Sequence, residues 1–592
     1  MVGKVRNNKT KQAQKPEVKR VPAYRVRRLI VLGLMSLAGI GLVVRAFQQQ
    51  ILETDFLQQE GQRRHVRVED VSFHRGLILD RNETPLAVSA PVDAVWANPR
   101  AIHALKDEDR EFIGPLARLL KVSSSRLEGQ LERKSKHSYT FLKRRLNPAD
   151  AEQIDKFLKS RGVTSVGLFR EYRRYYPTAE VFAQLLGFTD VDDKGQEGLE
   201  LRYNDKLEGE PGSKRVVRDG HAMIMDVESI REPVKGEDIV LSLDQRIQYF
   251  AYTSLKETVE KYRANHGYAV LLDTQSGEVL AMANYPSFNP NGDKNNRDKG
   301  YLNRAMTDQF EPGSTMKPFT IACALDAGTI KMDSVIDTTP GVFSVDGNDI
   351  TDAGNYGVID LATVIKKSSN IGASKIALSV PSSRLWDCFS RFGFGSPTLI
   401  DFPGEVSGQL DSAERWSKIR HATLSFGYGL TVSAMQLARA YATLAADGVR
   451  RPVSLLPVSN PPIGERVVNS DSAWSVRAMM EGVVTRGGTG TRAAVPGYRV
   501  AGKTGTVEKS SKGGYTKFRH QAIFAGLAPA SDPRLAMVVV VDEPKGKHYG
   551  GIVAAPVFSK VMGQALRLLN IPPDDLGPDG VRLAIEDMGA GQ

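Results

Sequence analysis

A run of sixteen uncharged, mostly apolar residues near the start of the chain constrains its fold more than any other feature. The run extends from Leu29 to Val44, follows a strongly basic segment and ends at Arg45. A helix of this length is slightly short for a bilayer core of about 30 Å, but arginines at both ends can snorkel toward the lipid headgroups. We predict an uncleaved transmembrane anchor over residues 29–47, because no small-residue cleavage site follows the run.

The net charge of the chain, +11, is concentrated before this anchor. Residues 1–28 carry ten lysines and arginines against Glu17 alone, so the remainder of the chain is close to neutral. This distribution removes the main support for nucleic-acid binding. Because positive flanks stay on the cytoplasmic side, we expect residues 1–28 to be a basic cytoplasmic tail. The rest of the chain is then expected on the periplasmic side of the inner membrane.

Cysteine and histidine usage argues against a disulfide framework and against a metal. The chain has two cysteines, Cys323 and Cys388, and nine scattered histidines. Cys323 lies in an apolar helical stretch, a setting in which a buried free thiol is common. We therefore expect free cysteines, and, because no metal-ligand spacing occurs, neither a metal site nor another cofactor.

The pattern of the chain changes near residue 235. Residues 48–235 begin with a polar helical segment and a strand near 63–70, and residues 101–158 show the spacing of two or three surface helices. Glycine and proline clusters then mark a boundary. In residues 236–571 strand patterns come from both ends and helical patterns from the middle, which predicts a mixed α/β domain. Residues 572–592 are predicted to be a flexible tail.

A serine and a lysine three residues apart are the first candidates for chemistry. Ser314 follows a glycine turn and starts an apolar helix, and Lys317 lies on the same helical face. A serine hydroxyl becomes nucleophilic when a base takes its proton, and a lysine can act as that base where burial or a nearby cation lowers its pKa. The S-x-x-K pattern alone is weak, because it occurs by chance in many chains.

Two later motifs strengthen this hypothesis, Ser368-Ser-Asn370 and Lys503-Thr504-Gly505-Thr506. In this order the three motifs resemble those of the penicillin-binding serine acyltransferases, S-x-x-K, S-x-N and K-[ST]-G. Ser368 could relay a proton between the two lysines and the leaving amine, and Asn370 could bind the substrate backbone. Thr504, Gly505 and Thr506 would bind the substrate as an added edge strand. The resemblance further implies an oxyanion hole formed by the N–H groups of Ser314 and Thr506.

The segment before residue 236 resembles the non-catalytic domain of the class B penicillin-binding proteins. The matching residues are Arg75 to Asn82 (RGLILDRN), Arg174-Tyr-Tyr-Pro177 and Gly198-Leu-Glu200, which we expect to form structural salt bridges and turns. The implied architecture is multidomain α/β. A single transmembrane helix precedes an elongated α+β pedestal, or dimerisation-like, domain over 48–235. A transpeptidase domain with a mainly antiparallel sheet flanked by helices covers 236–571.

Within class B, several flanking segments are similar to the cell-division transpeptidases of Gram-negative bacteria. These segments are Asp308 to Ser314 (DQFEPGS), Ser425 to Thr431 and Tyr549 to Phe558. The resemblance implies a septal peptidoglycan D,D-transpeptidase in which Ser314 attacks a D-Ala-D-Ala stem peptide and transfers the acyl group to an amine of a neighbouring stem. β-Lactam antibiotics would trap Ser314. The implied partners are the membrane, the SEDS-type glycosyltransferase FtsW and other divisome proteins.

Other functions are compatible with parts of this pattern. The elongation-specific class B transpeptidase is the nearest alternative. A β-lactam-hydrolysing enzyme shares the three motifs, but no Glu-x-x-Leu-Asn element lies between Asn370 and Lys503 to activate water. A β-lactam sensor normally has several membrane spans, and a bifunctional class A enzyme needs a glycosyltransferase domain. A purely non-catalytic scaffold is disfavoured because the catalytic positions are chemically intact.

Overall fold

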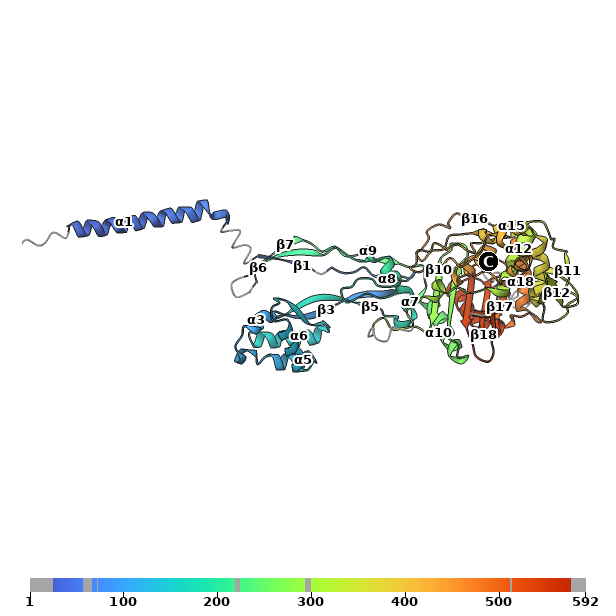
Figure 1. Ribbon diagram of the computed structural model, residues 1–592, viewed down its shortest axis with the longest axis horizontal. Coiled ribbons are helices and arrows are strands. Elements are labelled where there is room, and N and C mark those ends of the chain that lie inside the picture. Colours follow the sequence, from blue (N-terminus) through green and yellow to red (C-terminus); the bar gives the residue numbers. More distant parts are fainter. Residues whose placement is uncertain are drawn as a thin grey trace, which may run out of the picture. The chain divides into compact units, whose positions relative to one another are not determined.

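The computed structural model describes residues 25–56, 66–71, 73–218, 224–292, 300–511 and 514–575 (Figure 1). Two compact units form within these residues. The first combines the segment up to Val71 with residues 213–232, and the second combines residues 72–212 with the segment from 233 onward. The predicted tails at both ends fall almost entirely outside the described residues.

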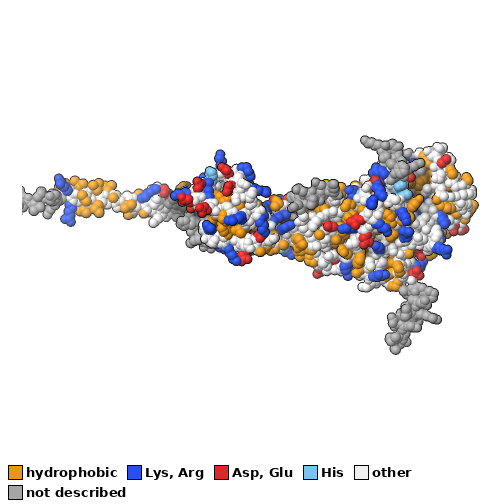
Figure 2. Space-filling view, turned by 90° about the horizontal axis from the view of Figure 1, so that it is seen from below, with side chains coloured by type: hydrophobic (Ala, Val, Ile, Leu, Met, Phe, Trp, Pro, Cys, Tyr) orange, Lys and Arg blue, Asp and Glu red, His pale blue; other side chains and the backbone are white. Residues whose placement is uncertain are grey.

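The first unit contains the predicted anchor. Helix α1 (Arg25–Phe47) continues into a π-helical turn, η1 (Gln48–Leu52), and is long and apolar enough to cross a membrane. Its apolar side chains are exposed, and Figure 2 shows them in orange along the helix with basic side chains at its start. A sheet with the order β1-β6-β7 completes this unit, formed by β1 (Val66–Val71), β6 (Gly212–Arg218) and β7 (Ile224–Arg231).

The second unit begins with a sheet covered by helices. Strand β3 (Pro85–Ala97) pairs with β5 (Val166–Tyr175), with β4 (Thr140–Leu146) and with β2 (Ile78–Leu79), and β2 pairs with β8 (Ile239–Val240). The helices are α3 (Pro99–His103), α4 (Ile113–Leu119), α5 (Ser124–Arg133) and α6 (Pro148–Ser160). The two or three helices predicted over 101–158 are present as α4, α5 and α6, but β4 was not predicted. Its pairing with β3, a partner distant in sequence, outweighs its local helical composition.

The family motifs of this region meet in a buried ion-pair network, as predicted. The Glu200 carboxylate lies 2.9 Å from Arg75 Nη2 and 2.6 Å from Arg174 Nε. Arg174 Nη1 also donates to the Gly76 carbonyl at 2.7 Å. All three charged side chains are fully or almost fully buried, so each charge depends on its partners to offset its desolvation.

The sheet of the region after residue 236 is antiparallel throughout and has the order β10-β9-β19-β18-β17. Its first two strands come from one end of the region and the other three from the far end, as predicted. The bounds are β9 (His266–Asp273), β10 (Val279–Tyr285), β17 (Ala501–Ser511), β18 (Gly514–Ala528) and β19 (Leu535–Asp542). Strand β17 contains the whole K-T-G-T motif.

Helices cover both faces of this sheet. On one face α10 (Gln245–Lys261) and α20 (Ala555–Leu568) pack on alternate residues such as Leu271 and Val539. The intervening residues, such as Val270 and Val538, pack toward α12 (Lys317–Asp326), α17 (Ala434–Ala445) and α18 (Ser470–Val484). Because both faces are covered, β19 is buried along its whole length.

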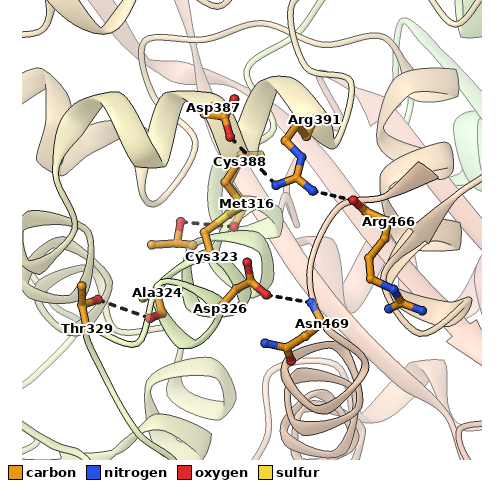
Figure 3. Close-up of a disulfide and its surroundings, with 11 residues drawn as sticks. Met316, Cys323, Ala324, Asp326, Thr329, Asp387, Cys388, Arg391, Arg466 and Asn469 are labelled. Atoms are coloured by element: carbon orange, nitrogen blue, oxygen red, sulfur yellow. Dashed lines mark hydrogen bonds and ion pairs between the residues drawn. A yellow bond between two sulfur atoms is a disulfide. The ribbon is translucent and has the colours of Figure 1, made fainter.

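The prediction of free cysteines is wrong. Cys323 on α12 and Cys388 on α15 (Ser382–Arg391) form a disulfide with their Cα atoms 6.0 Å apart (Figure 3). The pairing joins residues 65 positions apart in sequence, and only the packing of the two helices brings them together. Near the disulfide, the backbone N–H of Asn469 donates to the Asp326 carboxylate at 2.7 Å.

Candidate active site

The Ser314 hydroxyl is presented by a tight turn at the start of α12. Ser314 lies in a 3₁₀ turn, η5 (Gly313–Met316), and α12 begins immediately after it with Lys317 and Pro318. Proline is tolerated in the first helical turn because its missing N–H has no partner there. The turn is anchored by a hydrogen bond from Gly313 N–H to the Gly427 carbonyl, at 3.2 Å.

Lys317 lies directly beside this hydroxyl. Side chains three residues apart eclipse in a 3₁₀ turn, and Lys317 Nζ lies 3.0 Å from Ser314 Oγ. The amine is fully buried and also donates to the Ser368 carbonyl and to Asn370 Oδ1, the latter at 2.8 Å. The predicted pairing of Ser314 with Lys317 is therefore present in the structure, and these two further contacts hold the amine in place.

Ser368 connects the two lysines. It lies between α13 (Leu361–Lys367) and α14 (Asn370–Ser379) in a left-handed conformation, with φ of 61°. Its Oγ atom lies 3.1 Å from Lys317 Nζ and 3.0 Å from Lys503 Nζ. The three motifs, separated by up to 189 residues in sequence, thus form one continuous hydrogen-bonded chain from Ser314 to Lys503.

Asp352 holds the S-x-N turn, and sequence reasoning missed it. Its carboxylate accepts hydrogen bonds from Ser369 Oγ and from the backbone N–H groups of Asn370 and Ile371. The Asn370 amide in addition donates to the Thr351 carbonyl at 3.1 Å. No motif around Asp352 distinguishes it from other loop aspartates, so only the tertiary structure identifies this role.

Burial changes the protonation of both lysines. Lys317 and Lys503 have no exposed side-chain area. Burial lowers the pKa of Lys503 from 10.5 to about 7. Burial, and then the positive charge of Lys503, hold the pKa of Lys317 well below its usual value, with the Asp352 carboxylate opposing the shift. Lys317 is therefore able to accept a proton from Ser314 near neutral pH.

Strand β17 forms the edge of the sheet beside Ser314. It pairs with β18 only, so its other edge has no strand partner among the described strands. A Cβ atom on Gly505 would lie 3.2 Å from the Pro312 carbonyl oxygen and from the Thr315 side chain. The glycine therefore allows the Ser314 turn to pack closely on the strand, a reason for it that sequence reasoning did not anticipate.

The two threonines of the K-T-G-T motif are held by neighbouring loops. Thr504 Oγ1 and Thr489 Oγ1 lie 2.8 Å apart, and Thr506 Oγ1 accepts a hydrogen bond from Gly550 N–H at 3.0 Å. The resulting site offers a serine hydroxyl, a lysine amine with a lowered pKa, a second lysine and an open strand edge. Over the described ranges, no group of three or more His, Cys, Asp and Glu side chains is arranged to hold a metal ion.

Two family models match the chain. The penicillin-binding protein transpeptidase domain matches residues 267–563, and the penicillin-binding protein dimerisation domain matches residues 71–241. The first contains the S-x-x-K, S-x-N and K-T-G-T motifs, and the second contains the buried ion-pair network.

Individual proteins are similar over nearly the whole chain. The peptidoglycan D,D-transpeptidase FtsI of Escherichia coli K12 is 42% identical over 555 residues, which cover 93% of each protein. The probable peptidoglycan D,D-transpeptidase PbpC of Pseudomonas aeruginosa is 39% identical over 552 residues, 93% of this chain and 96% of that protein.

Solved structures show the same similarity. The transpeptidase domain of Burkholderia pseudomallei penicillin-binding protein 3 is 44% identical, with a TM-score of 0.53. The superposition covers 56% of this chain and 97% of the solved domain. A peptidoglycan synthetase from Bifidobacterium adolescentis is 25% identical, with a TM-score of 0.68, and covers 87% of this chain and 99% of its own.

Proposed function

Because the chain belongs to the class B penicillin-binding proteins, the peptidoglycan D,D-transpeptidases of the FtsI type, we propose that Ser314 is the nucleophile that is acylated by stem peptides and by β-lactams. One observation carries the proposal: an amine with a strongly lowered pKa, that of Lys317, lies 3.0 Å from the Ser314 hydroxyl. A protonated lysine could not accept the hydroxyl proton, whereas this one can.

Lys317 acts as the general base in the acylation step. Its neutral amine takes the Ser314 proton as Oγ bonds to the carbonyl carbon of the penultimate D-Ala of the donor stem. The peptide bond to the terminal D-Ala breaks, and the departing amine receives a proton through Ser368, which lies within hydrogen-bond distance of both lysines. An acceptor amine then attacks the ester and loses its proton along the same path, restoring the free Ser314 hydroxyl.

The remaining motif residues bind the substrate. The donor peptide adds to the open edge of β17 beside Thr504, Gly505 and Thr506, and the Asn370 amide binds its backbone. Lys503, when protonated, attracts the substrate carboxylate. The N–H groups of Ser314 and Thr506 stabilise the oxyanion of the tetrahedral intermediates.

The catalytic region lies on the periplasmic side of the inner membrane. The disulfide between Cys323 and Cys388 supports this orientation, because disulfides persist in oxidising compartments and are rare in the cytosol. The basic residues at the start of α1 favour a cytoplasmic N-terminus. An impermeant lysine reagent applied to intact cells should modify lysines after residue 48 only once the outer membrane is permeabilised, and modification that needs lysis of the inner membrane would contradict this orientation.

The enzyme acts in septal synthesis during cell division. We assign residues 48–235 to a non-catalytic pedestal and residues 236–571 to catalysis, with the anchor and the pedestal binding the glycosyltransferase FtsW and other divisome proteins. Similarity to FtsI along nearly the whole chain supports this role over the elongation-specific alternative. Depletion of the protein should give filamentous cells. Rounded cells would instead indicate the elongation role.

Labelling with a fluorescent penicillin tests the catalytic assignment. The wild-type chain should form one covalent adduct that maps to Ser314, and Ser314→Ala should form none while melting like the wild type. The penicilloyl ester should persist for hours, because no base directed at water lies in the hydrogen-bonded chain around Ser314. An adduct on Ser314→Ala at the wild-type rate would refute the assignment, and rapid turnover of the drug would identify a hydrolase instead.

A further inference from the structure

A row of aromatic side chains lies on one face of the sheet formed by β3, β4 and β5. Val95, Ala97 and Val166 pack against helices α4 and α6 on the opposite face. Because side chains alternate along a strand, the neighbouring residues of β3 and β5 project away from these helices. Trp96 and Phe169 project in this way, and Phe141 of β4 pairs with Trp96.

Each ring contacts the next one along the row. Tyr139 stacks on Trp96 with ring centroids 5.5 Å apart and an angle of 21° between the planes. Phe141 then lies 5.3 Å from Tyr139 and 6.4 Å from Phe169, in edge-to-face geometry. We call these four residues the aromatic row.

Two members of the row, Tyr139 and Phe169, are exposed. Tyr139 is 48% exposed and Phe169 is 37% exposed, whereas Trp96 and Phe141 are half-buried. A Cβ atom on Gly167 of β5 would lie 2.9 Å from the Trp96 ring. The glycine therefore lets the Trp96 indole lie against β5, while Tyr139 and Phe169 remain open to solvent.

Charged side chains beside the row are paired with one another. The guanidinium of Arg144 lies 4.8 Å from the centre of the Phe141 ring. The same group donates to Glu171 at 2.8 Å and to Asp192 at 2.7 Å. A strongly charged partner would have to compete with these pairs, and an apolar partner would desolvate them without compensation.

An uncharged, hydroxyl-rich ligand complements this surface better than a strongly charged or an apolar partner does. One face of a pyranose ring presents C–H groups that pack against the electron-rich face of an aromatic ring. Its hydroxyl edges can share hydrogen bonds with planar, ion-paired groups such as those of Arg144 and Asp192. A polymer of such rings can contact several members of the row at once.

We propose that the aromatic row binds the glycan strand of peptidoglycan, with sugar rings stacked on Tyr139 and Phe169. The choice of this glycan rests on the proposed function, because peptidoglycan is the polymer that a D,D-transpeptidase encounters. Binding there would hold the strand by a domain that takes no part in the acyl-transfer chemistry, while its stem peptides are processed at Ser314.

Binding of the N-acetylglucosamine hexamer tests the proposal. The full chain would be prepared in a detergent without a sugar headgroup and titrated calorimetrically with the hexamer and with glycan strands stripped of stem peptides. The test variant is Tyr139→Leu with Phe169→Leu, which keeps apolar area but removes the stacking rings. The matched control is Tyr249→Leu, which removes an aromatic side chain that is 53% exposed on α10.

The wild type and the control should bind both ligands, and the double variant should bind them at least tenfold more weakly. All three proteins should be acylated equally by a fluorescent penicillin, so that failure of glycan binding and failure of the proposed function can be distinguished. The proposal is overturned if the wild type binds neither ligand, or if the double variant binds as tightly as the wild type.

Discussion

Replacing Lys503 by methionine should stabilise the protein at neutral pH while abolishing its activity. Lys503 is fully buried, and its pKa falls from 10.5 to about 7 because burial disfavours the charged form. The folded state therefore binds the lysine proton far more weakly than the unfolded state does. A methionine of similar length carries no such penalty.

The size of this effect follows from the pKa and the contacts of Lys503. The fall of the Lys503 pKa from 10.5 to about 7 corresponds to a loss of about 4–5 kcal/mol in folding free energy at and below pH 7, since each pH unit is worth about 1.4 kcal/mol. Lys503 Nζ donates to Ser368 Oγ at 3.0 Å and to the Thr504 carbonyl at 3.1 Å. Loss of two such bonds costs about 1–2 kcal/mol each, so we expect a net stabilisation of about 2 kcal/mol.

The extra stability of Lys503→Met over the wild type should decrease as pH rises. Below pH 7 both states of the wild type hold the proton and the full penalty is present. Between pH 7 and 10.5 the unfolded state holds the proton and the folded state does not, so the stability of the wild type rises with pH. The melting temperature of Lys503→Met should therefore exceed that of the wild type at pH 7, and the difference should shrink and then reverse as pH approaches 10.5.

Melting temperatures of the detergent-solubilised full chain, measured from pH 6 to pH 10, test this reasoning. Lys509→Met is the matched control, because Lys509 lies on the same strand but forms ion pairs with Asp542 and Glu543 at 2.9 and 3.0 Å. That variant should melt below the wild type at pH 7. Equal melting temperatures of Lys503→Met and the wild type at pH 7, or a difference that stays constant with pH, would refute the argument from burial.

Three further perturbations have defined outcomes. Lys317→Arg should slow acylation by about 10²–10⁴, because a guanidinium stays protonated and cannot act as the base; a stopped-flow rate within a few fold of the wild type would contradict this. Cys323→Ala with Cys388→Ala, which opens a link between residues 65 positions apart, should destabilise the fold by about 4 kcal/mol; a reducing agent should lower the melting temperature of the wild type but not of the double variant. Glu200→Gln leaves two buried arginines without their counter-ion and should destabilise the pedestal by about 3–5 kcal/mol. Limited proteolysis should therefore cleave the variant faster than the wild type, and equal cleavage rates would argue against a stabilising role of the network.

Sequence reasoning succeeded where the information is local. The predicted anchor is a continuous apolar run, and strands β9, β10 and β19 are mostly apolar segments of seven or eight residues. It failed at β4, because the pairing of Phe141 with Trp96 depends on a strand 45 residues earlier. It also missed Asp352, whose importance lies entirely in the turn that it supports.

The sequence by itself determined an apolar helix long enough to cross a membrane and the order of the S-x-x-K, S-x-N and K-T-G-T motifs, because each depends on the chemistry and spacing of neighbouring residues along the chain. Only the tertiary structure decided that Cys323 pairs with Cys388 and that Lys317 is poised to accept a proton. Both depend on distances between segments far apart in sequence. Desolvation and Coulomb repulsion from Lys503 act through space, so the state of Lys317 is set by what folds around it.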